Sequence, residues 1–144
     1  MTTEVFPIGD QRVGIILDAA VLNGDDEPTF DELGAPVVTS STVWVDRALF
    51  EEQTPTENTD MITTTGIKAF AILPVAADQT IPAIDDDDNP VSLPFITDGR
   101  VTVNANARLT HNGLSYQMRG DAVLEQDLRG RPNHVFCLCE RTDH

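Results

Sequence analysis

Few residues of this chain are of the types that catalyse reactions or hold metal ions. Cys137 and Cys139 are two positions apart, a spacing that on a β-strand places both thiols on one side. A zinc site needs four ligands, and three scattered histidines do not complete one. A disulfide is disfavoured because alternate strand residues lie near the upper Cα–Cα limit of about 6.8 Å. We interpret the pair as two small, buried apolar side chains.

The aspartate run Asp85–Asp88 is the one segment that suggests calcium. An EF-hand loop starting at Asp85 requires a glycine where the chain has Pro90 and a closing glutamate where it has Ile96. The run therefore fails as an EF-hand loop. A solvated acidic loop is the favoured interpretation, and an irregular, low-affinity cation site is the alternative.

Other short motifs have ordinary explanations. Arg119-Gly120-Asp121 spells a cell-adhesion tripeptide, but it follows a predicted strand and is interpreted as a strand end with a glycine bend. His134 could act as an acid or base beside a carboxylate, although a hydrogen-bonded strand histidine is more common. The chain has no G-x-S-x-G, no glycine-rich phosphate loop and no H-E-x-x-H. The sequence thus predicts no enzyme, with no catalytic residue, cofactor or metal.

Acidic residues dominate the first two thirds of the chain. The whole sequence has 9 basic and 24 acidic residues, a net charge of −15. Residues 1–99 hold 19 acids against Arg12, Arg47 and Lys68 (−16), whereas residues 100–144 hold 5 acids and 6 arginines (+1). This charge argues against tight binding of DNA or RNA. An OB-type nucleic-acid-binding barrel is a remote alternative, since only 6% of the residues are aromatic. A calcium-dependent adhesion module is a second remote alternative.

The clearest structural prediction is a β-hairpin near the C-terminus. From Val101 to Leu109 apolar and polar residues alternate, which is typical of a half-buried strand. Asn112-Gly113 then favours a two-residue type I′ turn. Folding about this turn pairs apolar Leu109 with Tyr116 and Ala107 with Met118, and polar Arg108 with Gln117 and Thr110 with Ser115.

Turn-forming and acidic residues divide the rest of the chain. We expect an extended arm over 1–12, a strand or short helix over Val13–Leu22, a loop over Asn23–Gly34, one long or two short strands over Val37–Phe50, an exposed loop over Glu51–Asp60, a strand over Met61–Leu73 and a long loop over 76–98. A last strand, His134–Arg141, is apolar on both faces, as in a central strand or one that meets another subunit. Five to seven strands predict a mainly-β fold, a small antiparallel β-barrel or sandwich with long acidic loops.

The length of 144 residues suits a single domain over 1–144. The start of the chain does not resemble a secretory signal, and no apolar run approaches the ~20 residues of a membrane span. The expectation is a soluble chain with no membrane partner.

The C-terminal third resembles the signature of phage head-closure proteins, the head-to-tail stoppers (head-tail connectors) of long-tailed bacteriophages, especially those of actinobacterial hosts. The resemblance lies in Tyr116–Ala122 and Asp127–Glu140. In that family a hairpin ends in a Gly-Asp-Pro or Gly-Asp-Ala bend, a short piece with an Asp and a Gly follows, and a strand closes the domain. The matching positions are Gly120, Asp121, Ala122, Asp127, Gly130 and the strand 134–139. Residues 42–74 match loosely and the first 40 hardly at all.

The resemblance implies a structural protein of the virion neck, present in the host cytoplasm during assembly. Copies of the chain, six-fold symmetry being favoured, would form a ring below the portal-adaptor ring and above a tail terminator or tail tube. The ring would close the DNA channel after packaging and dock the tail, while genomic DNA passes without tight binding. Another neck component, a tail terminator or adaptor, is the alternative, although an adaptor should be mostly helical.

The resemblance and the charge together give two groups of candidate residues. Acids that line a DNA channel repel phosphate, so the channel-facing loop should be acidic. It corresponds most nearly to Phe50–Asp60, or else to the longer Ala76–Thr97; the candidates are Glu51, Glu52, Glu57, Asp60, Asp85, Asp86, Asp87 and Asp88. The ring must be held by apolar contacts and by arginines, which suit interfaces. The interface candidates are Trp44, Arg129, Arg131, Val135, Phe136 and Leu138.

Overall fold

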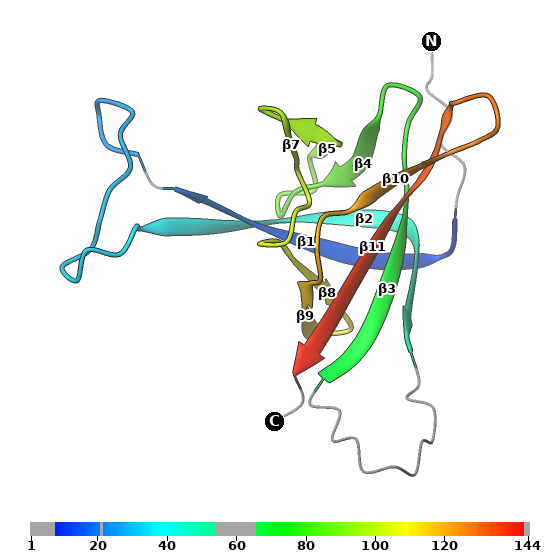
Figure 1. Cartoon of the computed structure of the whole chain (residues 1–144), viewed down its shortest axis with the longest axis horizontal. Coiled ribbons are helices and arrows are strands. Elements are labelled where there is room, and N and C mark those ends of the chain that lie inside the picture. The colour runs from blue at the N-terminus through cyan, green and yellow to red at the C-terminus, as the bar shows by residue number, and fades with distance from the viewer. Residues whose placement is uncertain (1–7, 21, 54–65, 143–144) are drawn as a thin grey trace.

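The computed structural model describes residues 8–20, 22–53 and 66–142. These residues form eleven β-strands and no helix (Figure 1). The strands are β1 (Gln11–Ala20), β2 (Val38–Glu52), β3 (Gly66–Pro74), β4 (Thr80–Ile84), β5 (Pro90–Pro94), β6 (Ile96–Thr97), β7 (Arg100–Val101), β8 (Arg108–His111), β9 (Leu114–Met118), β10 (Val123–Gln126) and β11 (Pro132–Thr142).

Six of these strands close into an antiparallel β-barrel. Their order around the barrel is β1-β8-β9-β11-β3-β2, and β2 pairs back with β1. Closure removes the unpaired edges that an open sheet exposes. Three smaller pieces are added: the β4–β5 hairpin beside β2, β10 beside β11, and the separate β6–β7 hairpin. The predicted mainly-β barrel is therefore confirmed.

The barrel interior is filled by one face of each strand. On β11, Val135, Cys137 and Cys139 are fully buried, whereas His134, Phe136 and Leu138 are half-buried on the outer face. Cys137 lies opposite Ala71 and Cys139 opposite Ala69 of β3. These small side chains share the interior with the large side chains of Phe50, Tyr116 and Met118, the mixture of sizes that a small barrel needs. Both cysteines are free and fully buried, as predicted.

The C-terminal hairpin has the predicted register. Leu109 faces Tyr116, Arg108 faces Gln117 and Thr110 faces Ser115, while the Met118 N–H donates to the Ala107 carbonyl at 3.1 Å. Asn112 (φ 52°) and Gly113 (φ 80°) have the positive φ values of a type I′ turn.

The predicted strand from Val101 to Leu109 was too long, because β8 begins only at Arg108. Asn104 bends the chain: the N–H of Asn106 donates to its Oδ1 and the N–H of Ala107 to its carbonyl, each at 2.9 Å. Ala105 is consequently exposed rather than buried. An asparagine side chain that binds the backbone here overrides the alternating pattern.

Several other predicted boundaries change. Val13–Leu22 is a strand up to Ala20 rather than a helix. The predicted strand region Val37–Phe50 is one long strand, β2, which extends to Glu52 and so includes the first two residues of the expected loop over Glu51–Asp60. Part of the expected arm over 1–12 belongs to β1, and residues 1–7 and 61–65 lie outside the described residues. The expected loop over 76–98 was wrong, since it holds β4, β5 and β6. Its prolines fit because they lie in a two-stranded hairpin at the margin of the sheet, where few N–H donors are needed.

Five turns of the described chain share one geometry. In each, the N–H of the first residue donates to the carbonyl of the fifth, and the N–H of the fourth donates to the carbonyl of the first. The fourth residue has a positive φ, as in a three-residue hairpin loop with a bulge. The turns are Asn23–Glu27, Asp31–Ala35, Ala76–Thr80, Asp85–Asn89 and Asp127–Arg131.

In four of these turns the first side chain also caps the turn. The Oδ1 of Asn23, Asp31, Asp85 or Asp127 accepts the N–H groups of the third and fifth residues, at 2.8–3.1 Å. The pattern explains the aspartate run in structural terms: Asp85 caps a tight turn, and Asp88 occupies the positive-φ position at 62°. Aspartate and asparagine suit both roles.

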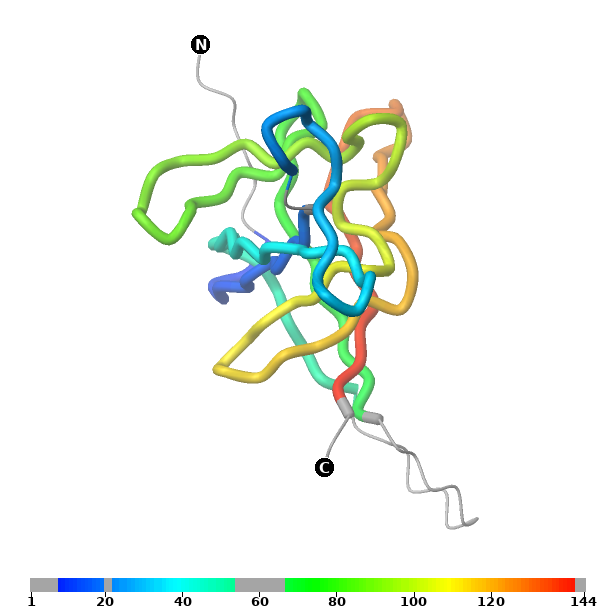
Figure 2. The backbone as a smooth tube through the Cα atoms, turned by 90° about the vertical axis from the view of Figure 1, so that its left-hand side faces the viewer, coloured from blue at the N-terminus to red at the C-terminus, as the bar shows by residue number. Residues whose placement is uncertain are grey.

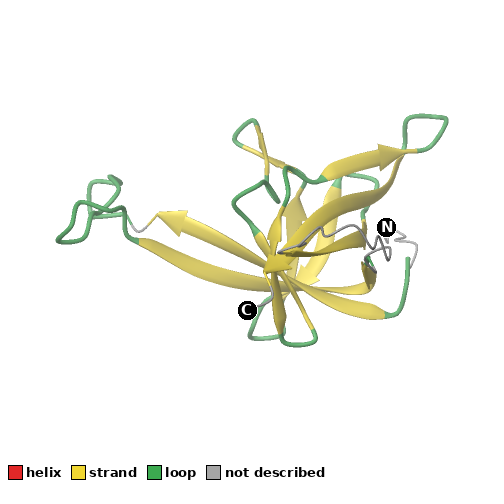
Figure 3. Cartoon of the chain, turned by 60° about the horizontal axis from the view of Figure 1, so that its bottom comes forward, coloured by secondary structure: helices red, strands yellow, loops and turns green. Residues whose placement is uncertain are grey.

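A long hairpin arm projects from the barrel. Residues 17–20 of β1 pair only with residues 38–41 of β2, since the strand pairing of β8 with β1 is limited to residues 14–16. We call residues 17–41 the arm. It extends to the left in Figure 1, and Figure 2, turned by 90°, looks toward its tip. The strand view of Figure 3 shows the same arm outside the closed barrel.

Gly14 is the tightest point of barrel closure, between β2 and β8. It lies opposite both Trp44 and Thr110. A Cβ at this position would come within 2.4 Å of Thr110 Cγ2 and 2.9 Å of the Trp44 ring. The tryptophan thus covers a backbone position where no side chain fits, a known way of stabilising a strand glycine.

We expect Gly14→Ala to lower the free energy of unfolding by about 1–3 kcal/mol, because the added methyl group overpacks this point. Denaturant-induced unfolding, followed by tryptophan fluorescence, measures the change. Gly24→Ala is the matched control, because a Cβ there contacts nothing within 4 Å; it should change stability by less than about 0.5 kcal/mol. Equal effects of the two substitutions would contradict this account of closure.

Candidate functional site

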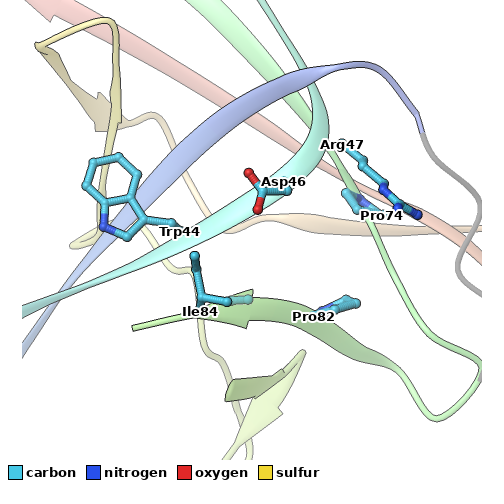
Figure 4. A pocket seen from close by; sticks show the side chains of 7 residues that line it. Trp44, Asp46, Arg47, Pro74, Pro82 and Ile84 are labelled. Atoms are coloured by element: carbon cyan, nitrogen blue, oxygen red, sulfur yellow. The ribbon is translucent and has the colours of Figure 1, made fainter. Parts of the chain in front are cut away.

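Trp44 lines the first candidate site, an open pocket on the outer face of β2 (Figure 4). The pocket has a volume of about 230 Å³, and its walls are mostly apolar: Trp44, Asp46, Arg47, Pro74, Pro82, Ala83 and Ile84. Trp44 Nε1 donates to Asp86 Oδ1 of the β4–β5 turn at 3.3 Å. The tryptophan therefore joins the barrel to this hairpin.

A β-bulge shapes the same pocket. The register between β1 and β2 shifts between Gln11 and Val13, and Arg47 has a positive φ of 61°. The Arg47 carbonyl accepts the N–H groups of Ile8 and Gly9, both at 3.1 Å. Asp46 is held by Arg12 through two hydrogen bonds of 2.7 and 3.1 Å. With its one carboxylate already paired, the pocket offers an apolar surface rather than a reacting group.

The second candidate site is a polar cluster at the end of β2, where three strands meet. The Tyr116 hydroxyl donates to Glu52 Oε1 at 2.5 Å, and Arg141 Nε donates to the same oxygen at 2.9 Å. Phe50 stacks on His111 with ring centroids 4.4 Å apart and meets Tyr116 edge-on at 4.8 Å. The cluster fixes the point where β2 leaves the barrel.

The electrostatics of this cluster suit structure better than catalysis. Hydrogen bonds from Arg141 and then Tyr116 lower the pKa of Glu52 below its ordinary value. Burial, with the Glu52 hydrogen bond next, raises the pKa of Tyr116 to about 12. At neutral pH the glutamate is therefore charged and the phenol is protonated. Both groups already use these states in binding each other, so neither is poised to transfer a proton.

The two groups of predicted channel-facing acids are not brought together. Glu51 and Glu52 lie at the end of β2, whereas Asp85–Asp88 form the turn of the β4–β5 hairpin. Asp86, Asp87 and Asp88 are exposed, Asp85 is partly buried as the cap, and Glu52 is paired with Arg141. Glu57 and Asp60 lie outside the described residues.

The predicted interface residues are spread over separate surfaces. Val135 is fully buried in the core, so it is not available to a partner. Phe136 and Leu138 are half-buried on the outer face, where Phe136 stacks on Phe70 with centroids 5.8 Å apart. Arg129 and Arg131 are exposed in the β10–β11 turn, and Arg131 pairs with Asp127 at 2.9 Å.

The remaining candidates for chemistry have structural partners. Burial raises the pKa of the Cys137 and Cys139 thiols to about 12, which makes both unreactive. His134 Nδ1 lies 2.8 Å from Asn133 Oδ1. In the tripeptide, Arg119 pairs with Glu140 at 3.7 Å, and Asp121 Oδ1 accepts the Ala105 N–H at 3.1 Å. Within 8–20, 22–53 and 66–142, no group of three or more His, Cys, Asp or Glu residues could hold a metal ion.

Sequence reasoning missed two features. The Glu52–Tyr116–Arg141 cluster joins residues up to 89 positions apart, and no local pattern indicates it. The β6–β7 hairpin did have a local signal, Asp98-Gly99, whose φ values of 53° and 78° form a second two-residue turn.

Comparison with protein-family models, with curated proteins and with solved structures gave no match to this chain. The described residues include no helix long and apolar enough to cross a membrane.

Removing the Tyr116 hydroxyl tests the cluster. Because the hydroxyl donates to a charged carboxylate and the tyrosine side chain is buried, we expect Tyr116→Phe to lower the free energy of unfolding by about 1–2 kcal/mol. Denaturant unfolding at pH 7 measures it. A loss below about 0.3 kcal/mol would show that the contact contributes little.

The cluster also predicts how stability depends on pH. Since the pKa of Glu52 is lowered from 4.5 in the folded state, its contribution is complete above pH 4.5 and is lost as the pH falls through the lowered value. Glu52→Gln should therefore be less stable than the unmodified chain at pH 7, with the difference shrinking in acid. Glu51→Gln neutralises the adjacent exposed carboxylate and should show no such convergence. Unfolding curves between pH 7 and pH 3 make the comparison.

Proposed function

We propose that this chain is a head-to-tail stopper, a structural protein of the neck of a long-tailed bacteriophage. Copies of the chain would form a ring between the portal-adaptor complex and the tail, close the DNA channel after packaging, and provide the docking face for the tail. A tail terminator is the nearest alternative; the all-β structure of the described residues argues against a helical adaptor.

The observation that carries this proposal is the structural role of the residues that resemble head-closure proteins. Gly120 has a φ of 120°, which strongly favours glycine, and the buried Ala122 donates its N–H to the Val103 carbonyl at 2.9 Å. Asp127 and Gly130 form the turn into β11. β11 pairs with β3, β9 and β10, and is thus the central strand of the C-terminal part. The resembling segment is therefore one continuous structural unit that completes the barrel.

The charge supports the same proposal. Six copies would carry about −90 (6 × −15) before counterions screen the field over roughly 8 Å. A negatively charged surface repels phosphate, so DNA would move past it without being bound. Such a protein suits a channel that DNA must traverse in both packaging and ejection.

Between the two acidic groups, the β4–β5 turn is the better candidate for the channel face. Glu52 is paired with Arg141 and belongs to the structural cluster. Asp86, Asp87 and Asp88 instead expose three consecutive carboxylates at the tip of a projecting hairpin. The Asp85 side chain caps the turn by accepting the N–H groups of Asp87 and Asn89, each at 2.9 Å. We therefore assign the DNA-facing role to Asp86–Asp88.

Neutralising this turn tests the assignment in the phage that encodes the chain. We expect Asp87→Asn with Asp88→Asn to leave particles assembled but to slow DNA ejection, because fewer carboxylates repel the DNA. Asparagine tolerates the positive φ of residue 88. Ejection triggered in vitro and followed by DNA release measures the rate.

Asp10→Asn with Asp98→Asn is the matched control, since these two exposed aspartates lie outside both the β4–β5 turn and the arm, and Asp98, like Asp88, has a positive φ. This control should leave the ejection rate unchanged. A particle map provides the independent check: the chain should lie in a ring below the portal with Asp86–Asp88 toward the axis. Its placement elsewhere in the particle, or tight binding of double-stranded DNA by the purified protein, would refute the proposal.

A further inference from the structure

Two of the five equivalent turns lie at opposite ends of the molecule. The Asp31–Ala35 turn is at the tip of the arm, and the Asp127–Arg131 turn joins β10 to β11. In Figure 1 the arm reaches the left-hand extreme and the β10–β11 turn the upper right, and Figure 3 shows the same separation after rotation. The two turns of one chain therefore cannot touch each other.

The two turns have matching frameworks. Each begins with an aspartate whose Oδ1 accepts two backbone N–H groups, at 2.9 and 2.9 Å in the arm and at 2.8 and 3.0 Å in the β10–β11 turn. Each has a glycine with positive φ at the fourth position, Gly34 and Gly130. Their second and third residues, the only two that the framework leaves free, are thus presented rigidly to solvent.

These free positions are complementary in chemistry. Each turn exposes one leucine almost completely: Leu33 is 94% and Leu128 107% exposed. The other position is Glu32 in the arm and Arg129 in the β10–β11 turn. A single exposed leucine is common on protein surfaces. Here, however, each leucine lies at the tip of a capped turn, and the charged residue next to it has the opposite sign in the two turns.

The surroundings extend this complementarity. The arm tip also exposes Leu22 and Phe30 among the acids Asp25, Asp26 and Glu27. In the β10–β11 turn the exposed Arg131 is paired with Asp127, so the excess positive charge of this turn is that of Arg129. An acidic, apolar tip and a basic, apolar turn fit each other, whereas two arm tips would repel.

We infer that the arm tip of one copy binds the β10–β11 turn of the next copy, with Leu33 against Leu128 and Glu32 against Arg129. The contact joins different surfaces at opposite ends of the chain, so it propagates head to tail and yields a ring where the rotation closes. The inference deepens the proposed function by naming the contact between subunits of the ring, and it can be tested on the isolated chain.

Cysteine cross-linking tests the contact directly. Leu33→Cys and Leu128→Cys replace exposed side chains, so folding should be unaffected, and the buried Cys137 and Cys139 should not react. A concentrated mixture of the two single variants, mildly oxidised, should form a 33–128 disulfide dimer several-fold faster than either variant alone forms a homodimer. The double variant should give a ladder extending beyond the dimer.

The matched control is Leu33→Cys with Ile96→Cys, because Ile96 is also an exposed apolar residue but lies in β6. This pair should cross-link no faster than random collision allows. The inference is overturned if the 33–128 and 33–96 pairs react at the same rate, or if homodimers of one variant predominate.

A charge exchange identifies the polar half of the contact. Glu32→Arg or Arg129→Glu alone should slow formation of the 33–128 disulfide several-fold, and the two together should restore the rate. Arg100→Glu reverses the charge of another exposed arginine and is the control. It should not slow formation of the 33–128 disulfide as Arg129→Glu does, and adding it to Glu32→Arg should not restore the rate. Failure of the double reversal to restore the rate would overturn the pairing of Glu32 with Arg129.

The two proposals fail in different ways. A head-to-tail ladder from a chain that particle maps place outside the neck would leave this inference standing and refute the stopper. A chain located in the neck, but without the 33–128 cross-link in either the concentrated protein or the particle, would refute this contact and leave the stopper standing.

Discussion

Closure of the barrel through β1 is the constraint on which the rest of the structure depends. β1 pairs with β2 along most of its length and with β8 only at residues 14–16. At that short junction the backbone must approach so closely that only Gly14 fits, and Trp44 covers it. A one-residue slip of β1 would turn Val13 and Ile15, both fully buried, toward solvent. The register of this junction therefore determines how the arm is directed.

Trp44 takes part both in barrel closure and in the attachment of the β4–β5 hairpin. The Trp44 ring packs over Gly14, while its Nε1 donates to Asp86 of the β4–β5 turn. Among the described residues, the β4–β5 hairpin pairs with the barrel at one position, Trp44 with Ile84, and its side chains Ile81, Ala83 and Leu93 pack in the core. The tryptophan that secures closure is therefore also one of the contacts that position this hairpin. Within the chain the indole N–H of Trp44 has a hydrogen-bond partner, as that of a partly buried tryptophan usually does. Its role at an interface between subunits stays a prediction.

The sequence predicts best those structural features that depend on residues close together in the chain. The hairpin around Asn112-Gly113 has its predicted register because turn type and side-chain alternation both act over a few residues. The prediction of a loop over 76–98 was wrong because prolines and aspartates, which are common in loops, here form tight turns and strands at the margin of the sheet. The Glu52–Tyr116–Arg141 cluster was not predictable, because the barrel alone brings these distant residues together. Of the two alternatives predicted from the two apolar faces of β11, the central strand is confirmed, because β11 pairs with β3 and β9. Val135, Cys137 and Cys139 face the core, and His134, Phe136 and Leu138 face outward.

Repeated use of one turn geometry separates framework from surface chemistry. The first residue and the positive-φ residue build the turn, so the side chains of the second and third residues are not part of the turn framework. In the β4–β5 turn these positions are Asp86, which also accepts a hydrogen bond from Trp44, and Asp87. In the arm they are Glu32 and Leu33, and in the β10–β11 turn they are Leu128 and Arg129. Under the two proposals made above, one turn geometry would present the DNA-facing carboxylates in one place and the two halves of the subunit contact in two others. For a chain of charge −15 this separation matters, because copies that repel one another overall can associate only where short-range apolar and opposite-charge contacts are placed by rigid turns.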